Sequence, residues 1–227
     1  MKREIIITSD GSTTIHLPEW NEQYHSKHGA IQEAYHVFIK HGLEAVSKSE
    51  LSIMEIGFGT GLNAFITFLE AHKNAKKIQY VGVEAYPVAL EEVAKLNYVS
   101  ELKAEELAEV FQKMHQISWE ENHVISNHFQ LEKREQFFHE ISKENQFDLI
   151  YFDAFGARVQ PDLWTEEIFL IMYKALKPNG ILTTYSAKGS VRRAMQAVGF
   201  SVERLPGPPG KREMLRAVKV ASGIQRS

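Results

Sequence analysis

Apolar positions along the first 50 residues change their spacing twice, and each change predicts a different element. Residues 5–8 and, apart from His16, residues 13–17 are apolar or β-branched and flank a turn containing Asp10-Gly11, which predicts a β-hairpin. Residues 18–29 show no regular period and predict a loop. Residues 30–41 carry apolar side chains at helical spacing and predict a helix.

Beyond residue 50, short apolar runs alternate with segments of helical period. Strands are predicted at residues 51–56, 79–84, 128–131, 148–153, 180–186, 201–204 and 213–220. Helices are predicted between them at residues 62–73, 87–96, 104–115, 134–141, 165–175 and 190–198. The run Leu149–Phe152 is continuously apolar, as expected for a strand covered on both faces. The alternation therefore predicts an α/β fold with a doubly wound, mostly parallel sheet.

The last two predicted strands are joined only by residues 205–212, which are too few for a crossover helix. They should therefore pair antiparallel, so that a seven-stranded sheet ends in one reversed strand. No internal repeat or low-complexity tract interrupts the chain. We expect residues 1–47 to form an N-terminal extension of hairpin, loop and helix that packs on a catalytic domain at residues 48–227.

Composition narrows the class of protein further. With 227 residues the chain suits one domain, and 44% hydrophobic with 24% charged residues is typical of a soluble globular protein. The absence of an apolar run long enough to cross a membrane, and of a signal peptide, predicts a cytoplasmic protein. Cysteine is absent, which excludes disulfides, thiolate metal sites and a Cys nucleophile, including the covalent Cys adducts used to methylate pyrimidine carbons.

A glycine-rich segment follows the first predicted strand of the sheet. Glycines at alternate positions allow a sharp turn and let a ligand lie against the backbone. Leu62 follows the last glycine, where a nucleoside triphosphate loop needs Lys and a dinucleotide loop needs Gly. The pattern E-x-G-x-G-x-G instead resembles the signature of class I S-adenosylmethionine methyltransferases, whose Rossmann-like sheet has the predicted architecture. We expect the cofactor S-adenosyl-L-methionine to contact Glu55, Gly57, Phe58, Gly59, Gly61 and Asn63.

A second acid follows the next predicted strand. Glu84 lies about 20 residues beyond the glycine loop, at the position of the ribose-binding acid in nucleotide-binding βαβ units. Its carboxylate is expected to accept hydrogen bonds from both ribose hydroxyls. The acid near the adenine amino group stays open between Glu132 and Glu135, which both follow the third strand.

Asp153 ends the most apolar predicted strand, where ligands bind in open α/β sheets. A carboxylate there would lie beside the cofactor, orient an incoming amine and assist loss of its proton. The alternative is that Asp153 only caps the turn that follows. We expect it to contact both the cofactor and the amine, with the choice between base and orienting group left open.

The motifs together resemble the MnmC-type (MnmD or DUF752) tRNA methyltransferases. The resemblance is carried by Tyr24–Phe38, Ile56–Asn63, Asp153–Thr165 and Thr183–Met214, which contain its Y-x-S, G-F-G-T-G-L-N, D-A-F and K-R-E-M motifs. It implies methyl transfer to the exocyclic amine of 5-aminomethyl-2-thiouridine at the anticodon wobble position, with tRNA as substrate and a link to enzymes that make the aminomethyl uridine. The family's Ala-Pro after D-A-F is replaced by Gly156-Ala157, which predicts a more mobile loop. Many relatives carry a fused flavin-dependent oxidase, and 227 residues predict the stand-alone methyltransferase.

The resemblance also suggests roles for residues outside the two main motifs. Tyr24 and Ser26 are expected near the cofactor, whereas Glu33 is expected near the substrate and Tyr185 to stack on a flipped base. The basic C-terminal part is expected to contact tRNA phosphates rather than only to form a solvated face. The cations concerned are Lys188, Arg192, Arg193, Lys211 and Arg212. No metal is expected, because the spacing of His25, His28 and His36 matches no common zinc pattern.

Two other functions remain open at this point. One is a small-molecule N-methyltransferase or an aminopropyltransferase of the same fold, although no acid-rich propylamine pocket is identifiable. The other is a non-catalytic tRNA-binding module, against which the intact glycine loop and Glu84 argue. The tRNA species, the oligomeric state and any channelling of substrate from a partner enzyme are not determined by the sequence.

Overall fold

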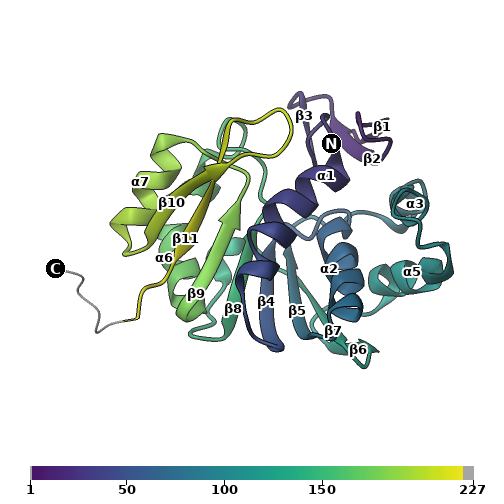
Figure 1. The fold of residues 1–227 in the computed structure, drawn as a ribbon. Helices are drawn as coiled ribbons and strands as arrows, with labels where there is room; N and C mark the ends of the chain where they lie inside the picture. Colours follow the sequence, from purple (N-terminus) through teal and green to yellow (C-terminus); the bar gives the residue numbers. More distant parts are fainter. Residues whose placement is uncertain (1, 222–227) are drawn as a thin grey trace.

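A computed structural model describes residues 2–221 and contains two sheets (Figure 1). The smaller sheet is antiparallel and N-terminal, with strands β1 (Glu4–Ile7), β2 (Thr13–Leu17) and β3 (Glu22–Gln23). The predicted hairpin is thereby confirmed, with Glu4 opposite His16 and Ile7 opposite Thr13. This sheet lies over one end of the main sheet.

The main sheet has eight strands in the order β10-β11-β9-β8-β4-β5-β7-β6. They are β4 (Glu50–Ile56), β5 (Lys77–Glu84), β6 (Asn122–Ser126), β7 (Phe129–Glu135), β8 (Phe147–Phe152), β9 (Leu176–Thr184), β10 (Ser201–Pro206) and β11 (Glu213–Val218). Strands β7, β5, β4, β8 and β9 run parallel, and β11 pairs antiparallel with both β9 and β10. The mostly parallel sheet and its reversed last strand are confirmed, while β6, antiparallel to β7 at the other edge, is an addition to the seven strands expected.

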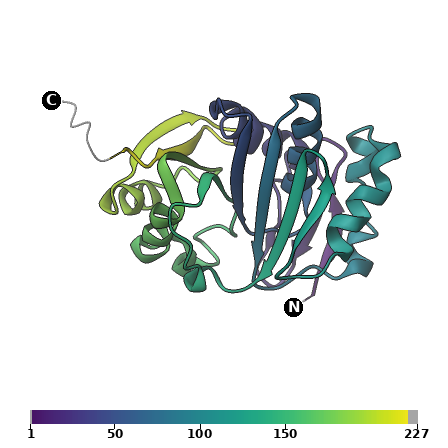
Figure 2. The same ribbon diagram turned by 90° about the horizontal axis from the view of Figure 1, so that it is seen from below.

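Helices cover the two faces of the main sheet. They are α1 (Ala30–Ala34), which continues as a π-helix to Lys40, α2 (Leu62–Lys73), α3 (Leu90–Val93), α4 (Tyr98–Glu101), α5 (Ala108–Gln116), α6 (Glu166–Ala175) and α7 (Gly189–Ala197). Figure 1 shows α1 and α2 in front of the strands, with α6 and α7 grouped at the β10–β9 end. Figure 2 shows α5 at the opposite end of the sheet.

The alternation of side chains along the central strands creates two separate cores. In β4, Ile53 packs with α1, α2 and α5, whereas Met54 packs with α6 and α7. In β8, Tyr151 belongs to the same core as Ile53, and Ile150 belongs to the same core as Met54. All six residues of this strand are buried. Continuous apolar strands are thus explained by burial of both faces.

Two predicted helices are wrong in whole or in part. The helix expected at residues 134–141 is absent, because β7 continues through Glu135 opposite Glu84 and is followed only by the 3-10 turn Phe138–Glu140. In β7 Leu131 and Lys133 are buried while their neighbours are partly exposed, a period of two that fits a strand. The helix expected at residues 87–96 is reduced to the single turn α3.

The carboxyl ends of β4, β5 and β8 lie at the same edge of the sheet, under the N-terminal sheet. The β10–β11 hairpin also reaches this edge, where the His36 imidazole Nε2 donates to the Pro206 carbonyl at 2.7 Å. Segments far apart in the sequence therefore meet over the strand ends, which is where ligands bind in open α/β sheets.

Candidate functional site

The glycine loop leaves β4 in a backbone conformation that requires glycine. Gly57, Gly59 and Gly61 have φ angles of 89°, 49° and 73°. A Cβ atom on Gly57 would lie 2.7 Å from the Asp153 carbonyl oxygen, so the loop packs directly on the end of β8. Gly61 then forms the N-cap of α2. The loop therefore presents bare backbone next to the carboxyl end of β8.

Glu84 at the end of β5 is fixed against this loop. Its carboxylate accepts hydrogen bonds from the Gly59 N–H at 2.9 Å and from the Tyr86 N–H at 3.0 Å. Burial raises the pKa of Glu84 above its ordinary value. The carboxylate is thus oriented before any ligand binds.

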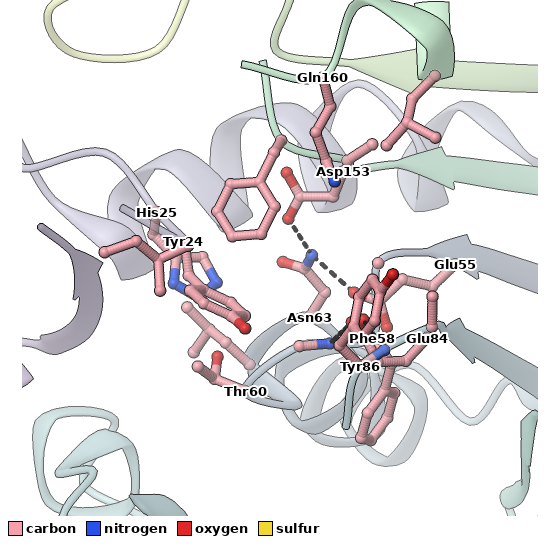
Figure 3. A pocket seen from close by; sticks show the side chains of 18 of the residues that line it. Tyr24, His25, Glu55, Phe58, Thr60, Asn63, Glu84, Tyr86, Asp153 and Gln160 are labelled. Carbon is pink, nitrogen blue, oxygen red and sulfur yellow. Dashed lines mark hydrogen bonds between the residues drawn. The ribbon is translucent and has the colours of Figure 1, made fainter. Parts of the chain in front are cut away.

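A cavity of about 590 Å³, here called the larger cavity, opens between the loop and the N-terminal sheet (Figure 3). Glu84 and Tyr86 lie along one side of it, and Asp153 and Gln160 lie at another. The aromatic side chains that line it are Trp20, Tyr24, Phe58, Tyr86, Phe137, Phe138 and Phe155. This mixture of apolar walls and a few fixed polar groups is typical of a small-molecule site.

A chain of buried polar groups lies under this cavity. The Asn63 side-chain N–H2 donates to Glu55 Oε1 at 2.8 Å and to Asp153 Oδ2 at 2.9 Å (Figure 3). The Tyr80 hydroxyl donates to the other Glu55 oxygen at 2.8 Å. Burial raises the pKa of Glu55 well above its ordinary value. Asp153 is therefore held by Asn63, which Glu55 holds in turn.

A second cavity of about 420 Å³, here called the smaller cavity, lies on the other side of Asp153. The two cavities share as lining residues Tyr24, His25, Asn63, Asp153, Ala154 and Phe155. Glu33, which is 6% exposed, accepts from the Ser26 N–H at 3.0 Å and pairs with the Lys211 ammonium. The Lys211 Nζ also lies 3.9 Å from the centroid of the Tyr185 ring. The smaller cavity thus has an ion pair and an aromatic ring in its wall.

Asp153 lies at the junction of the two cavities. Its burial, reinforced by the negative charge of Glu33, raises the pKa of Asp153 to about 7, against the opposing effects of Asn63 and Lys211. A carboxyl group with a pKa near neutral pH exchanges protons readily at that pH. The junction is therefore suited to handle a proton between two bound ligands.

The expected cofactor residues do not all line the larger cavity. Those that line it are Tyr24, Glu55, Gly57, Phe58, Gly59, Asn63, Glu84 and Asp153. Gly61 is the N-cap of α2 and lines neither cavity, and Ser26 lines the smaller cavity instead. Neither acid considered for the adenine end lines the larger cavity: Glu132 pairs with Arg134, and the Glu135 N–H donates to Glu120.

The expected substrate residues divide in a similar way. Glu33, Tyr185, Lys188 and Lys211 line the smaller cavity. Arg192, Arg193 and Arg212 line neither cavity; Arg193 and Arg212 are exposed on α7 and beside β11. The Tyr185 hydroxyl donates to the Ala154 carbonyl at 2.8 Å, so its ring is fixed in the cavity wall.

Two residues that the sequence did not predict for the site complete the larger cavity. Arg3 donates to Glu92 at 2.8 Å and to the Tyr86 carbonyl at 3.1 Å, and so joins the N-terminal sheet to the segment after β5. His25 lies in the wall shared by both cavities, next to the Thr14 hydroxyl at 3.1 Å. Burial lowers the pKa of His25 to about 4, so it is neutral at pH 7. Nothing in the sequence indicated that Arg3 belongs to the site. For His25 the only indication was its position beside Tyr24 in the N-terminal motif.

Two features are absent from residues 2–221. No helix in this part of the chain combines the length and apolar composition needed to cross a membrane. The same residues contain no group of three His, Asp or Glu side chains arranged to hold a metal ion.

Comparison with known proteins identifies related chains. A family model described as S-adenosyl-L-methionine-dependent methyltransferase matches residues 94–220, more than half of the chain. The tRNA 5-methylaminomethyl-2-thiouridine biosynthesis bifunctional protein MnmC of Marinomonas sp. (strain MWYL1) is 27% identical over 88% of this chain and 31% of the relative. The MnmC protein of Cupriavidus metallidurans is 27% identical over 93% of this chain and 33% of its own length. The chain thus spans about a third of the relatives it matches, and the resemblance inferred from the motifs is confirmed.

Solved structures support the fold. The crystal structure of MNMC2 from Aquifex aeolicus superposes with a TM-score of 0.77 at 24% identity, covering 96% of this chain and 70% of that chain. Spermidine synthase from Thermotoga maritima superposes with a TM-score of 0.52 at 14% identity. Both similarities concern the fold.

Proposed function

Because the chain belongs to the S-adenosyl-L-methionine-dependent methyltransferases, we propose that it methylates the exocyclic amine of 5-aminomethyl-2-thiouridine at the wobble position of tRNA. The observation that carries this proposal is the meeting of two cavities at Asp153. One cavity suits the cofactor and the other suits an amine on a planar base. The relatives of this chain that are named MnmC, which are similar to nearly the whole of it, support the choice of substrate.

The residues of the larger cavity fit S-adenosyl-L-methionine. A Cβ atom on Gly57 would lie 2.7 Å from the Asp153 carbonyl oxygen and one on Gly59 would lie 3.0 Å from the Tyr24 ring, so glycine lets the loop pack closely within the cavity wall. Glu84 is oriented to accept hydrogen bonds from ribose hydroxyls. Tyr86 and Phe137, whose ring centroids lie 6.0 Å apart, offer apolar surface for the adenine in place of the acid that was expected.

Asp153 is positioned to orient an amine and to take its proton. When bound, the cofactor supplies an electrophilic methyl group on a positively charged sulfur. The amine lone pair forms the new N–C bond, the S–C bond breaks with its electron pair going to sulfur, and one N–H proton leaves. Asp153, with a pKa of about 7, is suited to accept that proton. Most of the rate enhancement should come from in-line positioning.

The smaller cavity suits a nucleobase that has left its stack. Phe155 contacts Tyr24 at a ring-centroid distance of 4.9 Å, and Tyr185 forms another part of the wall. Such rings provide apolar faces for a flipped base. Lys188 lies exposed at the rim, where a cation can contact a phosphate.

We further propose that residues 1–47 act as an extension that completes both cavities over the domain at residues 48–227. Arg3 and Tyr24 contribute to the wall of the larger cavity, and Glu33 contributes to that of the smaller one. The Arg3–Glu92 ion pair at 2.8 Å supports this role by joining the extension to the segment after β5.

The test uses tritium-labelled S-adenosyl-L-methionine and tRNA that lacks the final methyl group. The label should enter this tRNA, and Asp153→Ala should reduce the rate by about 10³-fold or more while cofactor affinity changes little. Asp162→Ala, an exposed acid in the same segment, is the matched control and should retain full activity. Full activity of Asp153→Ala would remove this residue from the mechanism.

The same assay separates the alternative functions. Excess unlabelled tRNA should compete for the label if tRNA is the substrate, whereas a small-molecule methyltransferase or an aminopropyltransferase would be unaffected. A non-catalytic tRNA-binding module would show no rise in melting temperature with S-adenosylhomocysteine. Accumulation of the aminomethyl nucleoside in cells lacking the protein would support the proposal, and an unchanged nucleoside profile would contradict it.

A further inference from the structure

The carbonyl oxygen of the Asn63 side chain is a buried acceptor without a partner. Asn63 lies in the first turn of α2, is 3% exposed and lines both cavities. Its Oδ1 makes no hydrogen bond within residues 2–221. A buried acceptor left unpaired costs free energy, so an N–H or O–H group from a ligand is its natural partner.

The orientation of this amide is determined by its neighbours. The N–H2 group uses one proton for Glu55 and the other for Asp153. The reverse orientation would direct Oδ1 at an oxygen of the Asp153 carboxylate, which must be ionised to accept the proton of the amine, and the hydrogen bond to Asp153 would be lost. Oδ1 is therefore the atom that remains for a ligand at the junction, beside the Asp153 carboxylate.

We propose that Asn63 Oδ1 and Asp153 together form a two-acceptor site for a primary amine, and that this site limits the reaction to one methyl group. The inference rests on the proposed function and adds a reason for its product. Asn63 acts as a specificity-determining residue that touches the acceptor amine.

The chemistry of a primary amine fits two acceptors. Its two N–H groups can donate to Asn63 Oδ1 and to Asp153, which leaves the lone pair directed away from both. In the transfer the N–C bond forms and the S–C bond breaks with its electrons going to sulfur. The amine proton that was hydrogen-bonded to Asp153 then passes to the Asp153 carboxylate. The secondary amine produced has a single N–H, so on rebinding it would leave one of the two buried acceptors unpaired. Sites built to hydrogen-bond a group reject analogues that lack it.

Two tRNA substrates test the inference, one with the aminomethyl group and one with the methylaminomethyl group. Wild-type protein should methylate the secondary amine at least about 100-fold more slowly than the primary amine. Asn63→Ser should slow the primary amine by about 10-fold and affect the secondary amine less, so the ratio of dimethylated to monomethylated nucleoside should rise by about 10-fold. Mass spectrometry of digested tRNA measures this ratio independently of overall rate.

Asn74→Ser provides the matched control, because Asn74 lies at the other end of α2 and donates only to Glu70. It should leave the product ratio unchanged. An unchanged ratio in folded Asn63→Ser would overturn the inference. Equal rates of the wild-type protein on both amines would also overturn it, and that comparison needs no variant to fold.

The cofactor carries an amino group of its own, which could donate to Asn63 Oδ1 in place of the tRNA amine. Cofactor binding by the Asn63 variant distinguishes these two donors. S-adenosylhomocysteine contains this group, whereas 5′-methylthioadenosine lacks it. Asn63→Ser should change the affinity for both compounds by the same factor in calorimetric titration. A selective loss of affinity for S-adenosylhomocysteine would assign Oδ1 to the cofactor and overturn the inference. If wild-type protein transfers no methyl group to tRNA, the proposed function itself fails, which is a different result.

Discussion

The larger and the smaller cavity share the wall around Asp153, but their remaining walls come from the chain in different ways. Half of the residues that line the larger cavity lie within residues 55–63 and 84–92, at the ends of two adjacent strands, and the others come from the N-terminal segment and from residues 137–163. The smaller cavity joins residues 22–34, 153–158, 185–188 and 210–211. The larger cavity therefore has one βαβ unit as its base and is completed by other segments, whereas the smaller cavity is assembled entirely from segments that are distant in the sequence.

The polar groups of the two cavities also differ in whether their hydrogen-bond partners are near or distant in the chain. In the larger cavity Glu84 is held by the backbone N–H groups of Gly59 and Tyr86, which belong to the loops that follow β4 and β5. In the smaller cavity Glu33 is held partly by Lys211, from the far end of the chain. The first cavity should tolerate changes elsewhere in the protein, whereas the second should depend on how the β10–β11 hairpin docks on α1.

Removing the Glu84 carboxylate should have the largest effect, and this effect should be confined to ligand binding in the larger cavity. Glu84→Ala should weaken cofactor affinity by about 100-fold, because hydrogen bonds to two ribose hydroxyls are lost and the Gly59 N–H loses its partner. Titration calorimetry with S-adenosylhomocysteine measures this, with exposed Glu91→Ala as control. An equally large loss of tRNA affinity would show that the cavities are not independent.

The stability of the protein should depend on pH through the buried Asp153 carboxyl group in the shared wall. Its pKa is raised to about 7 in the folded state, so the folded protein binds a proton that the unfolded chain has lost between pH 4 and 7. Its contribution to stability therefore falls as pH rises through that range, by on the order of 4 kcal/mol over these three pH units. Asp153→Asn should remove this loss and be the more stable protein at pH 8 but not at pH 4, as denaturant unfolding at both pH values measures. Parallel stability profiles for the two proteins would contradict this.

The ion pair of the smaller cavity should affect stability without affecting the cofactor. Lys211→Met leaves the Glu33 carboxylate buried without its cation and should cost about 1–2 kcal/mol, less than for a fully buried pair because Lys211 is partly exposed. Glu33→Gln combined with Lys211→Met should recover most of this, which a double-mutant cycle measures. Additive losses, or a fall in S-adenosylhomocysteine affinity, would argue against the separation of the cavities.

The cations around the smaller cavity should have the smallest effects. Lys188→Ala and Arg193→Ala should each weaken tRNA binding by about 3-fold and make affinity less dependent on salt, while cofactor affinity stays the same. Filter binding at several salt concentrations measures this. Lys174→Ala, an exposed cation on α6, serves as control. If both Lys188→Ala and Arg193→Ala bind tRNA like the wild type, this face does not contact phosphates.

Much of the fold followed from the sequence because its signals are local. Continuous apolar runs predicted the central strands, and the short linker at residues 205–212 predicted the reversed last strand. The helix expected at residues 134–141 failed because the charged residues of β7 conceal a period of two. Lys133 is 1% exposed there, with its ammonium donating to the His115 carbonyl, a partner that the sequence does not reveal.

The sequence by itself determined the glycine loop, Glu84 and Asp153, because each depends on its own place at the end of a strand. The tertiary structure alone decided that Asn63 bridges Glu55 and Asp153, and that Glu33 meets Lys211 across 178 residues. Backbone conformation is fixed by neighbours along the chain, so it can be inferred from a short segment. Contacts between side chains depend on sheet order and register, which arise only when the whole chain has folded.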